Sequence, residues 1–172
     1  LISRGAALMP AALIRGGGQE KGHRSGTENF HGIIGFGAAA DAALEDSGAN
    51  RLRLEGMRDA LEAGMTAVAS DVIIHGRDVE RVGNTCFFTI PGLKSETGQI
   101  AFDIEGVALS AGSACSSGKV GQSHVLTAMG LDADLGALRM SIGPTTTSAD
   151  IDAALAAFKR ISGRRRSAGE AA

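Results

Sequence analysis

The sequence has 172 residues, of which 44% are hydrophobic and 21% charged, and its formal net charge is −2. This balance predicts a globular protein with a sizeable core, and it excludes a disordered acidic chain and a basic surface for nucleic acid. No apolar run approaches the roughly 20 residues that a membrane-spanning helix needs, so we expect a cytosolic protein. The first residue is Leu rather than Met, and the opening residues look like a strand entered midway, so we expect a segment upstream of this chain.

Two helices are predicted in the first half of the chain. Small and apolar residues dominate from Ile33 to Leu44, which predicts a helix over residues 28–45. A second helix is predicted over residues 51–69. Its apolar residues recur at helical spacing and indicate a face in the core, formed by Leu54, Met57, Leu61 and Met65.

The pattern changes after residue 70 to shorter elements. Four strands are predicted from their apolar and β-branched composition, at residues 72–75, 85–90, 107–109 and 138–142. Three helices are predicted at residues 95–103, 124–129 and 150–161. Ser95 and Ser148 are the expected N-caps of the first and last of these helices, and Gly130 is expected to end the middle one.

Helices and short strands that interleave in this way predict the α/β class, with an α+β sheet covered on one face after residue 70. We expect residues 1–50 to be the remnant of a larger domain. Residues 51–163 are expected to form a compact small domain, and residues 164–172, which include three consecutive arginines, a flexible tail.

Cys115 is the stronger of two candidate nucleophiles. It lies in a loop of small residues over 110–118, which leaves a thiol reachable, and Lys119 or His124 could lower the pKa of this thiol by folding back toward it. A loop cysteine without a role is the plainer alternative. Cys86 lies in a β-rich apolar run and is expected to be a small core residue, and both cysteines are expected to be reduced.

A Gly-rich polar stretch, residues 15–29, leads directly into the first predicted helix. Backbone N–H groups and a hydroxyl at such a turn can hold a phosphate, because helix N-termini carry partial positive charge. The alternative is a surface loop in which Thr27 is an ordinary N-cap.

Arg139 is a lone cation among apolar residues on the predicted strand at 138–142. A buried guanidinium needs an anionic partner, and a substrate carboxylate would serve. An internal ion pair and outward exposure on a polar face are the alternatives. No metal-ligand spacing is found among the four histidines, His23, His31, His75 and His124.

Together these segments resemble the cysteine desulfurases of the NifS/IscS type, in the class V aminotransferase family of fold-type I pyridoxal-phosphate enzymes. The resemblance covers nearly the whole chain. It rests on several ordered motifs, GGGQE at 16–20, RSGTEN at 24–29, NT at 84–85, SACSSG at 113–118, SHVL at 123–126, AMGL at 128–131 and RMSIG at 139–143. It implies the C-terminal part of such a transferase, with the end of the large cofactor-binding domain followed by an α+β small domain.

By this resemblance, Cys115 takes sulfur from L-cysteine and holds it as a persulfide, leaving L-alanine. Arg139 binds the substrate α-carboxylate, and Thr27 contacts the cofactor phosphate, in relatives across a homodimer interface. The Cys115 loop is similar to that of relatives that hand sulfur to iron–sulfur scaffold proteins, and Cys115 is a candidate transient iron–sulfur ligand. The sequence departs from the family at Gln122, where a proline is common, and at Pro144, where relatives carry a larger residue.

The expected cofactor is pyridoxal 5'-phosphate, and the resemblance places its Schiff-base lysine upstream of this chain, with the Asp and His that contact the cofactor ring. The four lysines of the chain do not match the lysine motif, namely Lys21, Lys94, Lys119 and Lys159. The isolated chain is therefore expected to be inactive.

The expected partners are L-cysteine, a sulfur-acceptor or iron–sulfur scaffold protein and a second copy of the chain, with neither nucleic acid nor membrane. Two alternatives stay open. One is a selenocysteine or cystine lyase of the same family, and the other is a non-catalytic sulfur-carrier or interaction fragment.

Overall fold

The computed structural model describes residues 11–45, 48–112, 124–132 and 136–170. The chain divides into two units, residues 1–46 and residues 47–172. The division falls four residues before the boundary predicted at residue 50. Each unit is described by itself.

The described part of the first unit is a Gly-rich loop followed by a helix. The loop contains one short 3-10 turn, η2 (Gln19–Gly22), and α1 spans Phe30–Glu45, close to the predicted 28–45. None of the residues of α1 is buried, although several are large and apolar, such as Phe30, Ile33 and Phe36.

The second unit is built on a four-stranded antiparallel sheet. Its strands are β1 (Ile73–Ile74), β2 (Thr85–Thr89), β3 (Ser110–Ala111) and β4 (Ala137–Ser141). Their order across the sheet is β1-β2-β4-β3, so the two longest strands lie at the centre.

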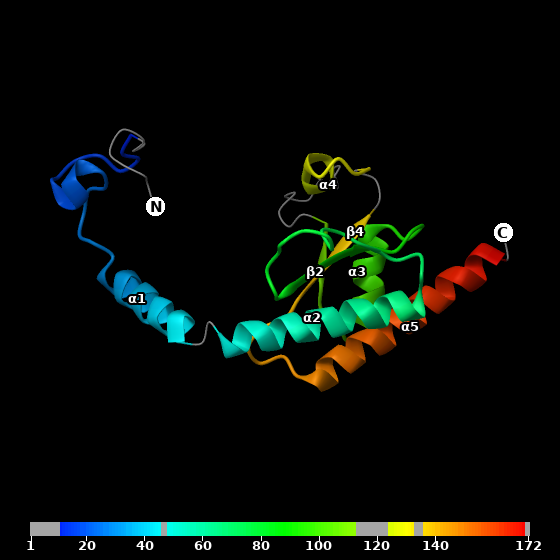
Figure 1. Cartoon of the computed structure of the whole chain (residues 1–172). Coiled ribbons are helices and arrows are strands. Elements are labelled where there is room, and N and C mark those ends of the chain that lie inside the picture. The colour runs from blue at the N-terminus through cyan, green and yellow to red at the C-terminus, as the bar shows by residue number, and fades with distance from the viewer. Residues whose placement is uncertain (1–10, 46–47, 113–123, 133–135, 171–172) are drawn as a thin grey trace. The chain divides into compact units, whose positions relative to one another are not determined.

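Helices cover one face of this sheet, as Figure 1 shows. These helices are α2 (Ala49–Val68), α3 (Ser95–Ile104) and α5 (Ser148–Glu170). A further short helix, α4, spans His124–Ala128 and contributes none of its described residues to this core. Alternate residues of β2 and β4 pack with the helices into a single core, whose largest fully buried side chains include Phe88, Phe102, Phe158, Leu61 and Met65. The expected α+β sheet covered on one face is confirmed. Among the described residues, no helix has the length and apolarity to cross a membrane.

Three local predictions were wrong. Residues 107–109 are irregular, and the strand follows them at Ser110–Ala111, because those two residues pair with β4. Ser148 does not cap α5: the Thr147 hydroxyl accepts a hydrogen bond from the Asp150 backbone N–H at 3.4 Å, and the Asp150 carboxylate accepts one from the Thr147 N–H at 2.8 Å. At α3, no side chain caps the N-terminus, so Ser95 does not have the predicted role either.

The last helix also extends further than predicted. A flexible tail is predicted from residue 164, but α5 continues to Glu170. Ion pairs hold this extension: Arg164 pairs with Glu105, as does Arg160, and Arg165 pairs with Asp71. The arginine run is therefore part of the folded unit.

Candidate functional site

Arg139 lies at the middle of β4, on the face of the sheet opposite the helices. Its neighbours Leu138 and Met140 belong to the core, and side chains alternate between the two faces of a strand. Directly across the sheet, Arg139 is paired with Phe87 of β2 on one side and with Ser110 of β3 on the other. These three residues form a row on the face opposite helices α2, α3 and α5.

The guanidinium of Arg139 is only partly satisfied. Its Nη2 donates a hydrogen bond to the Ser110 Oγ at 3.3 Å, while its buried Nε has no acceptor among the described residues. Within the described ranges, no Asp or Glu forms an ion pair with Arg139, whose side chain is half-buried. Neither an internal ion pair nor full exposure therefore describes it. A buried donor without an acceptor is costly, which suits a site that receives an anion from outside.

Cys115 lies outside the described residues, as does Lys119, so the expectation that Lys119 or His124 lowers the pKa of its thiol stays a prediction. The structure does describe the segment that leads to it. The Gly112 backbone N–H donates to the Ala137 carbonyl at 2.7 Å, which anchors the chain against β4 three residues before Cys115. The loop of Cys115 therefore begins next to the strand that carries Arg139.

Cys86 is free and 1% exposed, and burial raises the pKa of its thiol, with the Glu62 carboxylate adding to this shift. A thiol with a raised pKa and no access to solvent is a poor nucleophile. The prediction of a small core residue is confirmed.

Thr27 does not cap α1. That role belongs to Asn29, whose Oδ1 accepts from the Gly32 N–H at 3.2 Å. The Thr27 backbone carbonyl accepts a hydrogen bond from the Arg24 guanidinium, which also donates to the Gly26 carbonyl at 3.0 Å. The Thr27 hydroxyl is thus left without a partner in the described part of the chain, and an exposed hydroxyl donor of this kind fits a phosphate oxygen.

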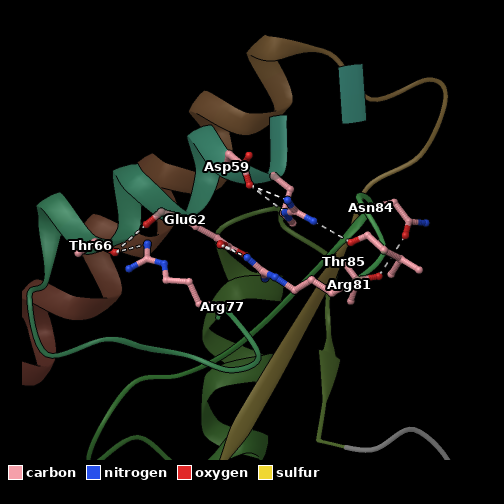
Figure 2. Close-up of polar contacts among 9 residues, drawn as sticks. Asp59, Glu62, Thr66, Arg77, Arg81, Asn84 and Thr85 are labelled. Atoms are coloured by element: carbon pink, nitrogen blue, oxygen red, sulfur yellow. Dashed lines mark hydrogen bonds and ion pairs between the residues drawn. The ribbon is translucent and has the colours of Figure 1, made fainter. Parts of the chain in front are cut away.

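Two features of the second unit were not predicted from the sequence. One is Ser110, whose contact with Arg139 depends on strand register that the sequence does not display. The other is the buried pair of Glu62 and Arg81, drawn in Figure 2, in which both guanidinium Nη atoms donate to the carboxylate at 2.6 and 2.7 Å. Its available signal was an acidic residue directly after Leu61, at the edge of the apolar face of the second predicted helix. No group of three possible metal ligands is found among the described residues.

Residues 15–154 match the family model for aminotransferase class V. The chain belongs to the class V aminotransferase family. A protein of Mycobacterium tuberculosis named IscS-like cysteine desulfurase is 38% identical over 175 residues, which cover 100% of this chain and 44% of that protein. The cysteine desulfurase NifS of Azotobacter vinelandii is 38% identical over 153 residues, covering 88% of this chain and 38% of that protein.

A solved NifS-like structure from Rickettsia africae superposes with a TM-score of 0.75 at 34% identity, covering 87% of this chain and 39% of that one. The fold is therefore that of the class V aminotransferases, as predicted. The chain spans less than half the length of these relatives, and its correspondence to their C-terminal part stays a prediction.

Proposed function

We propose that the full-length protein containing this chain is a pyridoxal-phosphate-dependent cysteine desulfurase, which converts L-cysteine to L-alanine and keeps the sulfur as a persulfide on Cys115. The observation that carries the proposal is the half-buried guanidinium of Arg139, whose Nε has no acceptor in the described chain. The names of the relatives support the reaction class.

Arg139 would bind the α-carboxylate of the substrate. A guanidinium offers two parallel N–H donors to a carboxylate, which fixes orientation as well as supplying charge. The residue opposite Arg139 on β2 is Phe87, and an apolar neighbour cannot compete with the substrate for these donors.

Cys115 would act as the nucleophile through its thiolate. The sulfur of Cys115 attacks the substrate sulfur, an S–S bond forms as the substrate C–S bond breaks, and the carbon left behind takes a proton to become the methyl group of alanine. When bound, pyridoxal phosphate supplies the electron sink that stabilises a carbanion. Thr27 would donate its hydroxyl to the cofactor phosphate, and the Schiff-base lysine would come from outside this chain.

The acceptor of the sulfur would be a second protein, such as an iron–sulfur scaffold, with Cys115 as a transient iron–sulfur ligand. A loop of small residues suits this role, because a thiol on it can be reached by both substrate and acceptor. We further propose that the protein acts in the cytoplasm as a homodimer.

The test is the release of sulfide and alanine from L-cysteine by the full-length protein, with pyridoxal phosphate and a thiol reductant. Cys115→Ala is compared with Cys86→Ala as the matched control, because Cys86 is buried in the core. We expect Cys115→Ala to abolish both products and Cys86→Ala to retain them. Unchanged turnover by Cys115→Ala would overturn the persulfide role and favour a lyase.

A further inference from the structure

Ser110 is the one described side chain that forms a hydrogen bond with the Arg139 guanidinium. The two residues are directly opposite each other in the register of β3 and β4, and the next pair is Ala111 with Leu138. Because Ala111 and Leu138 belong to the core face, Ser110 and Arg139 share the other face. The contact is therefore set by the backbone of the sheet.

An arginine side chain has four rotatable bonds before its planar head, and ordering it on substrate binding costs conformational entropy. A hydrogen bond to one Nη restricts the plane of the guanidinium in advance. The Ser110 contact uses Nη2, and within the described part of the chain it leaves Nε without an acceptor. A serine suits this purpose better than a carboxylate, since an Asp or Glu would neutralise the charge that an incoming anion needs.

We propose that Ser110 is a positioning residue, which holds the Arg139 guanidinium in the plane that accepts the α-carboxylate of the substrate. The proposal rests on the proposed function. Ser110 would also connect Arg139 to the segment that leads to Cys115. This segment runs from β3, which carries Ser110, to Gly112, whose backbone N–H is hydrogen-bonded to β4.

The experiment compares Ser110→Thr with Ser110→Val in the full-length enzyme. These two side chains have nearly the same shape, and only threonine carries the hydroxyl, so packing and β-propensity are matched. We expect Ser110→Val to raise the KM for L-cysteine by about 5-fold relative to Ser110→Thr, with kcat unchanged, since the single long hydrogen bond that orients the guanidinium is lost. The inhibition constant of L-alanine, which carries the same carboxylate, is expected to rise by the same factor.

Equal KM and inhibition constants for the two variants, in an enzyme that turns over, would overturn the positioning role while leaving the desulfurase function intact. A lower kcat at unchanged KM would also overturn it. Ser141→Ala, at the exposed end of β4, is the control and is expected to leave both parameters unchanged. Absence of sulfide release from the unaltered protein would remove the proposed function, and this proposal with it.

Discussion

Arg81 and Arg139 are two arginines of one folded unit that are satisfied in opposite ways. Arg81 donates both Nη groups to Glu62, at 2.6 and 2.7 Å, and the two side chains are 18% and 3% exposed (Figure 2). This contact raises the pKa of Arg81. Among the described residues, the Arg139 guanidinium forms one hydrogen bond, with the uncharged side chain of Ser110. A fully paired arginine such as Arg81 is part of the architecture, whereas the buried donor of Arg139 without an acceptor in the described chain supports the proposed ligand site.

The largest effect is expected at Glu62. Glu62→Ala leaves the Arg81 guanidinium without its partner and creates a small cavity on α2, so we expect the free energy of unfolding to fall by about 3 kcal/mol. Urea denaturation followed by circular dichroism measures this change. Replacing both partners by apolar residues, Glu62→Leu with Arg81→Met, is expected to restore most of the loss. A fall below about 1 kcal/mol for Glu62→Ala would contradict a structural role for the pair.

At Arg139, we expect a substitution to impair substrate binding and to leave stability nearly unchanged. Arg139→Gln is expected to raise the KM for L-cysteine about 100-fold in the full-length enzyme, because a charge-assisted contact with the carboxylate is lost. Its free energy of unfolding should change by less than about 1 kcal/mol, since no carboxylate is left unpaired. Arg81→Gln is the matched control, with the reverse pattern of lost stability and unchanged KM. Equal effects of the two variants on KM would abolish the distinction between them.

The sequence was informative where a pattern repeats. The long helices were predicted within two residues, except that α5 continues past 161, because their apolar and small residues extend over several turns. Arg139 was found because a single charge in an apolar run is conspicuous. The motifs also led to the family, which the match over residues 15–154 shows.

What the sequence did not reveal depends on pairing between distant segments. The partner of Arg139 is 29 positions away, and that of Arg81 is 19 positions away. Strand register decides the first pair, and the packing of the loop before β2 on α2 decides the second. The predicted strand at 107–109 was displaced for the same reason: apolar composition indicates a strand, but the hydrogen bonds to β4 determine where it begins.

His75, a buried basic side chain of the same unit, differs from both arginines because burial favours its neutral form. It is 5% exposed, its Nε2 is hydrogen-bonded to the Thr89 Oγ1 at 2.8 Å, and its ring contacts Phe87. Burial lowers the pKa of His75 below 6.5, so the unfolded chain binds a proton more readily than the folded chain. The contribution of His75 to stability should therefore be fully present well above pH 6.5 and should fall as the pH is lowered through 6.5.

Urea denaturation of the chain at pH 7.5 and pH 5.5 measures this dependence, and the effect is expected to be smaller than that of Glu62→Ala. His75→Gln cannot titrate, and it should lose part of the difference between the two pH values. If the variant and the unaltered chain show the same difference, other groups carry the pH dependence and the buried neutral histidine does not contribute.

The smallest effect is expected at Asp59, which lies one helical turn before Glu62 on α2. Asp59 also accepts hydrogen bonds from an arginine, with its Oδ1 at 3.0 and 2.8 Å from the Arg58 Nε and Nη2, but its side chain is 62% exposed. Asp59→Ala should change the free energy of unfolding by less than about 0.5 kcal/mol, because water replaces the lost contact. Denaturation in parallel with Glu62→Ala gives the measurement. Both carboxylates lie on α2, and each is paired with an arginine. A similar loss of stability from both variants would mean that burial does not separate structural ion pairs from dispensable ones. The buried Nε of Arg139 would then no longer support a ligand site.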